Sequence, residues 1–177
     1  YVNPNFATGF DLGIQLHGLI HGKWNYQVGI FNGTGADVNV ASKTMCDDHK
    51  WLPALLYSGR FAYMPKGEMP ASQGDPNNLK SDKMLIGVSA SYSDLRVGAE
   101  FAMMKNRFYL AAEAYYMNMH FTKIQNKSDD MNFWGGYVQA GYFITSKLQG
   151  ALRYDFMDRN GLDTGGLLNM PAIGVNY

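Results

Sequence analysis

Two short segments carry residue types that could bind a metal ion. Cys46 and His49 have C-x-x-H spacing in a polar stretch, but haem attachment needs C-x-x-C-H, and the chain has only 1 cysteine. The run Asp158–Asp163 begins like a calcium loop but is not followed by the closing glutamate that such a loop uses. We interpret the first pair as incidental and the second run as a connection between strands. No metal or cofactor is expected.

Covalent catalysis is equally poorly supported. The chain has 4 histidines, and none has an evident serine or cysteine partner at a catalytic spacing. No G-x-S-x-G motif, P-loop or dinucleotide fingerprint occurs. We therefore expect no catalytic residues and do not interpret the chain as an enzyme.

Composition narrows the class further. The 177 residues are 46% hydrophobic and only 17% charged, which argues against disorder. The 15 Lys and Arg residues are balanced by 15 Asp and Glu residues, so bulk positive charge for binding nucleic acid is absent. No apolar run is long enough for a transmembrane helix. Membrane strands are not excluded, because their alternating residues average out in hydropathy.

A period of two dominates the chain. From Phe10 to Ile20, apolar residues alternate with small or polar ones, and the pattern returns after the turn His21–Lys23. We expect nine strands, over about 10–20, 24–30, 55–64, 84–92, 96–103, 108–116, 134–142, 152–156 and 167–177. Strands of about ten residues exceed the globular mean and suit a tilted bilayer crossing. The expected fold is therefore all-β, an antiparallel transmembrane β-barrel, with residues 1–177 forming part of one such domain.

The less apolar set of alternating positions defines the expected lumen. It is rich in Gly, Ser, Gln and Ala, which leave room for water inside a wide barrel. The pore-lining candidates are the three arginines Arg60, Arg96 and Arg153, the four carboxylates Asp11, Glu100, Glu113 and Asp155, and the amides Gln15 and Gln139. The arginines could select anions. Alternatively, an arginine and a neighbouring carboxylate could form cross-strand pairs that stiffen the wall.

Aromatic residues gather near the strand ends. The candidates for a membrane-interface girdle are Trp24, Tyr63, Tyr92, Phe108, Trp134 and Tyr142. An amphipathic ring at this depth places its polar tip at the lipid headgroups. Tyr and Trp are also common strand formers, which is the alternative explanation.

The connections alternate between short and long, as in outer-membrane barrels. Short turns are expected at 21–23, 105–107 and 145–147, and long loops at about 33–54, 65–82 and 120–132. Counting strands places 65–82 on the periplasmic side, where its length is unusual.

Several segments together resemble the phosphate-selective porins of the porin O and P family. They are Gly13–Gly18, Asn25–Gly33, Gly59–Phe61 with Pro65, Gly136–Phe143, Ala151–Tyr154 and Gly174–Tyr177. The resemblance spans nearly the whole chain. It implies a homotrimer of sixteen-stranded barrels in the outer membrane of a Gram-negative bacterium, in contact with the bilayer and lipopolysaccharide. It also implies lumenal arginines, and Arg60 and Arg153 stand at matching places.

Nine strands do not close such a barrel, so we expect the chain to be an internal fragment. Three functions stay open. The first is passive diffusion of small hydrophilic solutes, including anions such as phosphate. The second is a scaffold or sheath for a partner protein, such as an electron-transfer cytochrome. The third is a soluble all-β binding protein.

Overall fold

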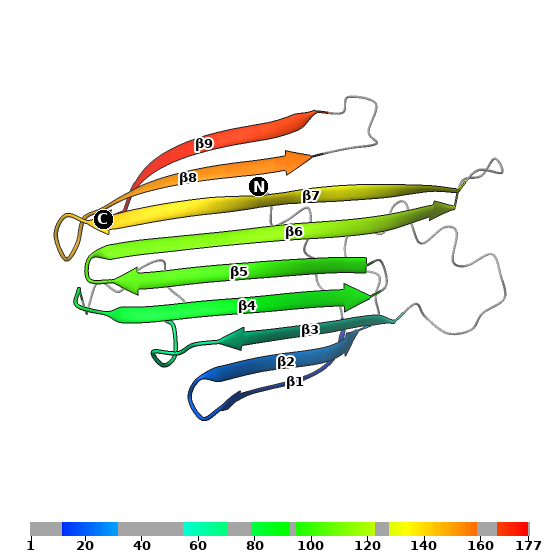
Figure 1. Cartoon of the computed structure of the whole chain (residues 1–177), viewed down its shortest axis with the longest axis horizontal. Coiled ribbons are helices and arrows are strands. Elements are labelled where there is room, and N and C mark those ends of the chain that lie inside the picture. The colour runs from blue at the N-terminus through cyan, green and yellow to red at the C-terminus, as the bar shows by residue number, and fades with distance from the viewer. Residues whose placement is uncertain are drawn as a thin grey trace.

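The computed structural model describes residues 12–31, 55–70, 79–92, 95–122, 128–158 and 166–176. Within these ranges the regular structure is a single nine-stranded sheet (Figure 1). Its strands are β1 (Gly13–Ile20), β2 (Trp24–Phe31), β3 (Leu56–Tyr63), β4 (Asp82–Tyr92), β5 (Leu95–Lys105), β6 (Phe108–Thr122), β7 (Ser128–Phe143), β8 (Gln149–Asp158) and β9 (Leu167–Asn176). The all-β antiparallel architecture expected from the sequence is confirmed.

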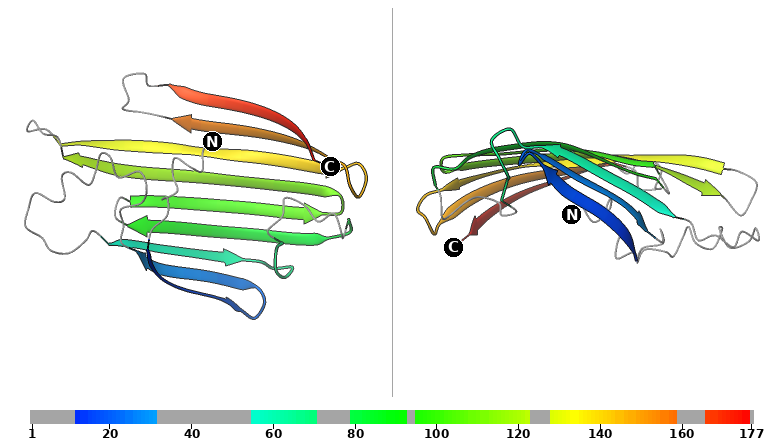
Figure 2. Two further views of the ribbon diagram at one scale, coloured as in Figure 1. Left: turned by 180° about the vertical axis from the view of Figure 1, so that it is seen from behind. Right: turned by 90° about the horizontal axis from the view of Figure 1, so that it is seen from below.

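Each strand pairs antiparallel with its neighbour in the chain, in the order β1 to β9. Figure 2 shows a bowed sheet whose two edges, β1 and β9, bend towards the same side. The described strands do not close on themselves, because β1 and β9 are the two ends of the strand order. The architecture is that of a length of barrel wall.

The short turns form where the backbone can reverse tightly. Between β1 and β2, His21 and Gly22 both have positive φ, and the Lys23 amide donates to the Ile20 carbonyl at 3.1 Å. This conformation matches the twist of the two strands that it joins. Between β5 and β6, Asn106 takes the positive φ. Asparagine tolerates this conformation better than most residues.

The register separates the sheet into two faces. In an antiparallel sheet, directly paired residues point to the same side. One outer row runs through Gly18, Tyr26, Phe61, Val88, Ala99, Ala114, Gly136, Phe156 and Asn169. The adjacent inner row runs through His17, Gln27, Arg60, Ser89, Gly98, Tyr115, Gly135, Met157 and Leu168.

The outer face exposes large apolar side chains across the whole sheet. Ile14 is 84% exposed, Val88 58% and Leu152 59%. The inner face is more crowded, and Gln139 and Asp155 on it are only 7% and 5% exposed. Side chains converge on the concave side of a curved sheet and diverge on the convex side. A water-soluble sheet would hide its apolar face instead, so the outer face suits a lipid surround.

Two expected loop boundaries differ in the structure. The connection expected at 65–82 ends one residue early. Asp82 is already the first residue of β4, where it pairs with Lys105 of β5. The loop expected at 120–132 is largely strand, because β6 continues to Thr122 and β7 begins at Ser128. This extension lacks the apolar alternation that marked the other strands, since backbone pairing outside a membrane does not require it. The loop expected at 33–54 lies outside the described residues.

Among the residues that the structure describes, no helix is long and apolar enough to cross a membrane.

Candidate functional site: the charged inner face

The inner face brings together the predicted pore-lining residues that the structure describes. These are Gln15, Arg60, Arg96, Glu100, Glu113, Gln139, Arg153 and Asp155, and all of them share one side of the sheet by register. Asp11 lies outside the described residues. Three arginines and three carboxylates therefore face the same side.

Arg60 on β3 is held by an ion pair that crosses β4. Its Nε donates to Glu100 Oε1 on β5 at 2.5 Å, and its Nη1 donates to Asn25 Oδ1 on β2 at 2.9 Å. Gly87 on β4 makes the crossing possible, because a Cβ there would lie 2.8 Å from Glu100 Cγ. The glycine thus provides the space through which the glutamate reaches the arginine.

Glu100 directly opposes Glu113 on β6, a pairing of like charges that would be unfavourable without compensation. Each carboxylate has its own partners. Glu100 binds Arg60, whereas Glu113 Oε1 accepts a hydrogen bond from the Tyr137 hydroxyl at 2.5 Å. The Tyr115 hydroxyl donates to the other oxygen of Glu113. Hydrogen bonding at both oxygens stabilises the ionised carboxylate.

Arg153 on β8 is bound more completely than Arg60. Its Nε and Nη2 donate to the two oxygens of Asp155 at 2.9 and 2.8 Å, and its Nη1 donates to Gln139 Oε1 at 3.3 Å. Its guanidinium carbon lies 3.8 Å from the ring centroid of Tyr137. Tyr137 therefore links Arg153 to Glu113, and the two form one network across β6, β7 and β8.

These contacts favour the wall-stiffening alternative for Arg60 and Arg153, because both arginines pair with carboxylates. Pairing does not bury these side chains completely. The Arg60 and Glu100 side chains keep 28% and 24% of their exposure, and Arg153 keeps 26%. The arrangement gives a surface on which positive and negative side chains alternate and remain partly open to water.

Sequence reasoning missed the segment that follows β3. Met64 is 3% exposed and packs with Ala62 and Leu85 of the inner face. Met69 contacts this cluster and a second one built on Met104. The chain therefore folds over the inner face of β4 and β5 near the short turns, instead of leaving the sheet directly.

Polar contacts fix this segment in place. The Gly67 amide donates to the Met64 carbonyl at 3.1 Å with a φ of 84° at the glycine, and Lys66 pairs with Asp82 at 2.6 Å. Lys83 donates to the Lys66 carbonyl at 3.1 Å. Lys83 lies opposite Met104 on the inner face and was not among the candidates. Continuing the period of two back from Leu85 would have found it.

The aromatic candidates lie on the outer face in two groups. Trp24 stacks on Tyr63 beside the first turn with centroids 4.2 Å apart, and Phe108 pairs with Tyr142 beside the β5–β6 turn. Towards the opposite ends of the strands, Tyr92 is 68% exposed. Trp134 also lies on this side, and its indole nitrogen donates to Asp158 at 2.7 Å.

The distance between the two aromatic groups along the strands is comparable to the height of the apolar band of an outer-membrane barrel. From Met84 to Tyr92, β4 spans about 27 Å at roughly 3.4 Å per residue. At a barrel tilt of about 40°, this corresponds to an apolar band about 20 Å tall.

No group of three or more His, Cys, Asp or Glu side chains in the described ranges could hold a metal ion. The Cys46–His49 pair and residues 159–163 of the calcium-like run lie outside those ranges.

The sheet has an apolar outer face and a polar inner face, and each strand pairs with its neighbour in the chain. These features are those of the wall of an outer-membrane-type β-barrel. The chain belongs to the family of phosphate-selective porin O and P, which matches residues 3–177. This is a family of channels, not of enzymes. Membership implies a location in the outer membrane of a Gram-negative bacterium. No curated protein and no solved structure gave a match.

Proposed function

We propose that this chain forms part of the wall of a passive diffusion channel for small hydrophilic solutes. The observation that carries the proposal is the difference between the two faces of one sheet. The outer face exposes Ile14, Val88 and Leu152, while the inner face holds hydrogen-bonded charges. Only a barrel with lipid outside and water inside satisfies both faces at once.

Passage through such a channel depends on pore width and on the charges that face the water column. Arg60, Arg96 and Arg153 are matched in number by Glu100, Glu113 and Asp155 among the described residues of the inner face. We therefore propose a modest preference for small anions, such as phosphate, in place of strict exclusion of cations. Lys83, whose amine donates to a backbone carbonyl, adds one positive charge to this face, whereas the charge of Lys66 is balanced by Asp82.

The same proposal specifies the lipid contacts and the assembly of the channel. The outer face contacts the acyl chains of the bilayer, and the aromatic groups contact headgroups and lipopolysaccharide at its two borders. The channel assembles as a homotrimer in the outer membrane of a Gram-negative bacterium. These features rest on the family and on the exposed apolar surface.

Liposome swelling tests passive diffusion. Vesicles containing the full-length protein are placed in solutions of neutral sugars of increasing size. We expect swelling rates that fall as the sugar grows, and no swelling of protein-free vesicles. Folded protein that admits none of these sugars would contradict the proposal and favour a barrel that acts as a sheath for a partner protein.

A further inference from the structure

Apolar side chains gather on the inner face near the short turns, where they would meet water if nothing lay above them. By register and packing they are Ala62, Leu85, Ala102, Met104 and Ala111. Met104 is only 1% exposed. A single sheet leaves the space above each face open, so burial to this extent requires a cover. Another part of the chain therefore lies over this patch.

The cover is the segment after β3, residues 64–70. Met69 packs against the two buried clusters of the patch, one containing Ala62 and the other Met104. The Met69 amide also donates to Met64 Sδ at 3.4 Å. Because Met64 follows the end of β3 and Met104 lies on β5, the segment crosses β4 on its inner side.

The local sequence gives this segment a defined shape. Residues 64–67 form a turn in which the fourth amide donates to the first carbonyl at 3.1 Å. Pro65 takes the second position and Gly67, with a φ of 84°, the fourth, and both residues are favoured at these positions of a type I turn. The Lys66–Asp82 ion pair holds the turn against the start of β4. The segment is thus fixed at the turn by polar contacts and at Met69 by apolar packing.

The segment lies inside the barrel and not beyond its rim. Ala102 packs against the same two clusters and stands three residues before the end of β5 at Lys105, about 10 Å along the strand. Packed peptide layers lie roughly 10 Å apart, so the segment places a second layer at about that height above the wall. Glu68, the neighbour of Met69, is exposed on this layer.

We propose that the segment after β3 is a constriction on the short-turn side of the channel that limits the size of the solutes that pass. Met69 anchors the constriction to the wall, and Glu68 presents its side chain to the water column. The constriction deepens the proposed channel function and rests on it, because a size limit requires that solutes pass. It acts on neutral solutes through pore width, whereas the charges of the inner face act on ions.

Adding bulk at Glu68 tests the constriction. Glu68→Cys is made in the full-length protein after every native cysteine, Cys46 included, has been replaced with serine. The same preparation is compared before and after labelling with N-pyrenylmaleimide, a rigid neutral reagent, and mass spectrometry confirms the labelling. Liposome swelling is measured in arabinose and in the largest neutral sugar that the unlabelled protein admits. The ratio of the two rates reports pore width and does not depend on how many channels have inserted.

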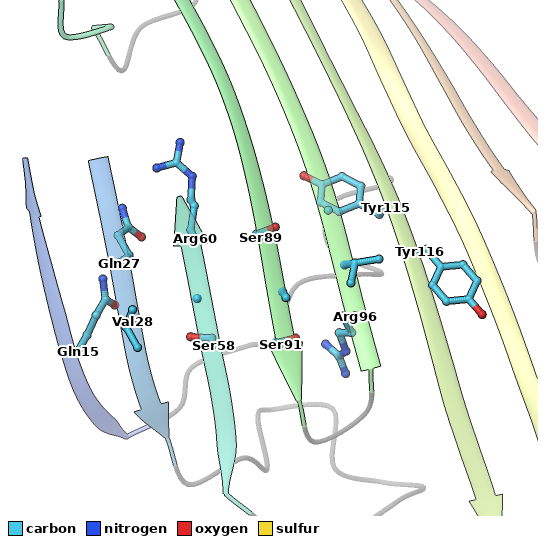
Figure 3. Close-up of a pocket in the computed structure, with 14 residues that line it drawn as sticks. Gln15, Gln27, Val28, Ser58, Arg60, Ser89, Ser91, Arg96, Tyr115 and Tyr116 are labelled. Atoms are coloured by element: carbon cyan, nitrogen blue, oxygen red, sulfur yellow. The ribbon is translucent and has the colours of Figure 1, made fainter. Parts of the chain in front are cut away.

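Ser91→Cys supplies the matched control on the inner face of β4. Ser91 lies in a hollow of about 410 Å³ that also contains Ser58 and Ser89 (Figure 3). A label there stands on the wall itself, in a place where the inner face is hollowed. We expect labelling at residue 68 to lower the ratio of large to small sugar about threefold, and labelling at residue 91 to leave it nearly unchanged.

An unchanged ratio after complete labelling of Glu68→Cys would overturn the constriction and leave the channel function intact. An equal fall for labelled Ser91→Cys would do the same, because it would show that bulk anywhere on the inner face has this effect. Folded, unlabelled protein that admits no sugar would contradict the channel function, and the constriction with it.

Discussion

Replacing Glu100 with glutamine removes one negative charge from the inner face and releases Arg60 from its ion pair. The two groups lie 2.5 Å apart and both keep about a quarter of their exposure, so the released guanidinium faces water. We expect the channel to become more selective for anions. The substitution is nearly isosteric and leaves room for a neutral hydrogen bond to Arg60, so the fold is expected to persist.

The size of the effect follows from Coulomb's law. One unit charge about 8 Å from a permeating ion in water contributes roughly 0.5 kcal/mol before screening. With Debye lengths of about 30 and 10 Å at 0.01 and 0.1 M salt, this falls to roughly 0.4 and 0.2 kcal/mol. Anions gain what cations lose, so the permeability ratio of anions to cations rises about fourfold at 0.01 M and about twofold at 0.1 M. At 1 M the effect is almost fully screened.

Zero-current potentials of the full-length protein, measured under salt gradients at these three ionic strengths, test the prediction. Glu100→Asp keeps the charge and serves as the control, with an unchanged ratio. An unchanged ratio for Glu100→Gln at 0.01 M would refute the reasoning. So would a shift that is equally large at 1 M, because it would indicate a structural change and not a loss of charge.

Three further changes test other parts of the account. The double change Arg60→Ala with Arg153→Ala is expected to move the zero-current potential towards cations, and unchanged ion preference would show that these arginines only support the wall. Val88→Lys on the outer face is expected to lower the free energy of unfolding by about 2–4 kcal/mol, measured by urea unfolding of vesicle-embedded protein. Ser89→Lys at the adjacent inner position is expected to lower it far less. Equal losses would contradict the assignment of the faces. Met69→Ala leaves a void between the two inner clusters and is expected to lower the unfolding free energy by roughly 1–2 kcal/mol, since the side chain is only partly buried. An unchanged unfolding midpoint would show that the segment after β3 does not pack as described.

The sequence predicts the strands and their faces well because one physical requirement acts on every residue of a membrane strand. Lipid on one side and water on the other impose a period of two, which Ile14, Gln15 and Leu16 already display. Where the membrane no longer acts, the pattern fades. The end of β6 and the start of β7 continue as paired backbone beyond the apolar alternation, so the alternation alone predicts a loop there.

Partners across the sheet are harder to predict. Alternation places Arg60 and Glu100 on one face, but their contact joins residues 40 positions apart and crosses β4 at Gly87. The register places Glu100 directly opposite Glu113, and the side-chain contacts show that two tyrosine hydroxyls donate to Glu113. The inward fold of Met64 and Met69 depends on packing against clusters built from several strands, for which a local sequence pattern gives no signal.

The most direct test of the central claim is the ion conductance of the full-length protein in a planar bilayer. The account predicts stable open channels, with a zero-current potential that modestly favours anions at low salt. Correctly folded, membrane-inserted protein that conducts no ions would contradict it.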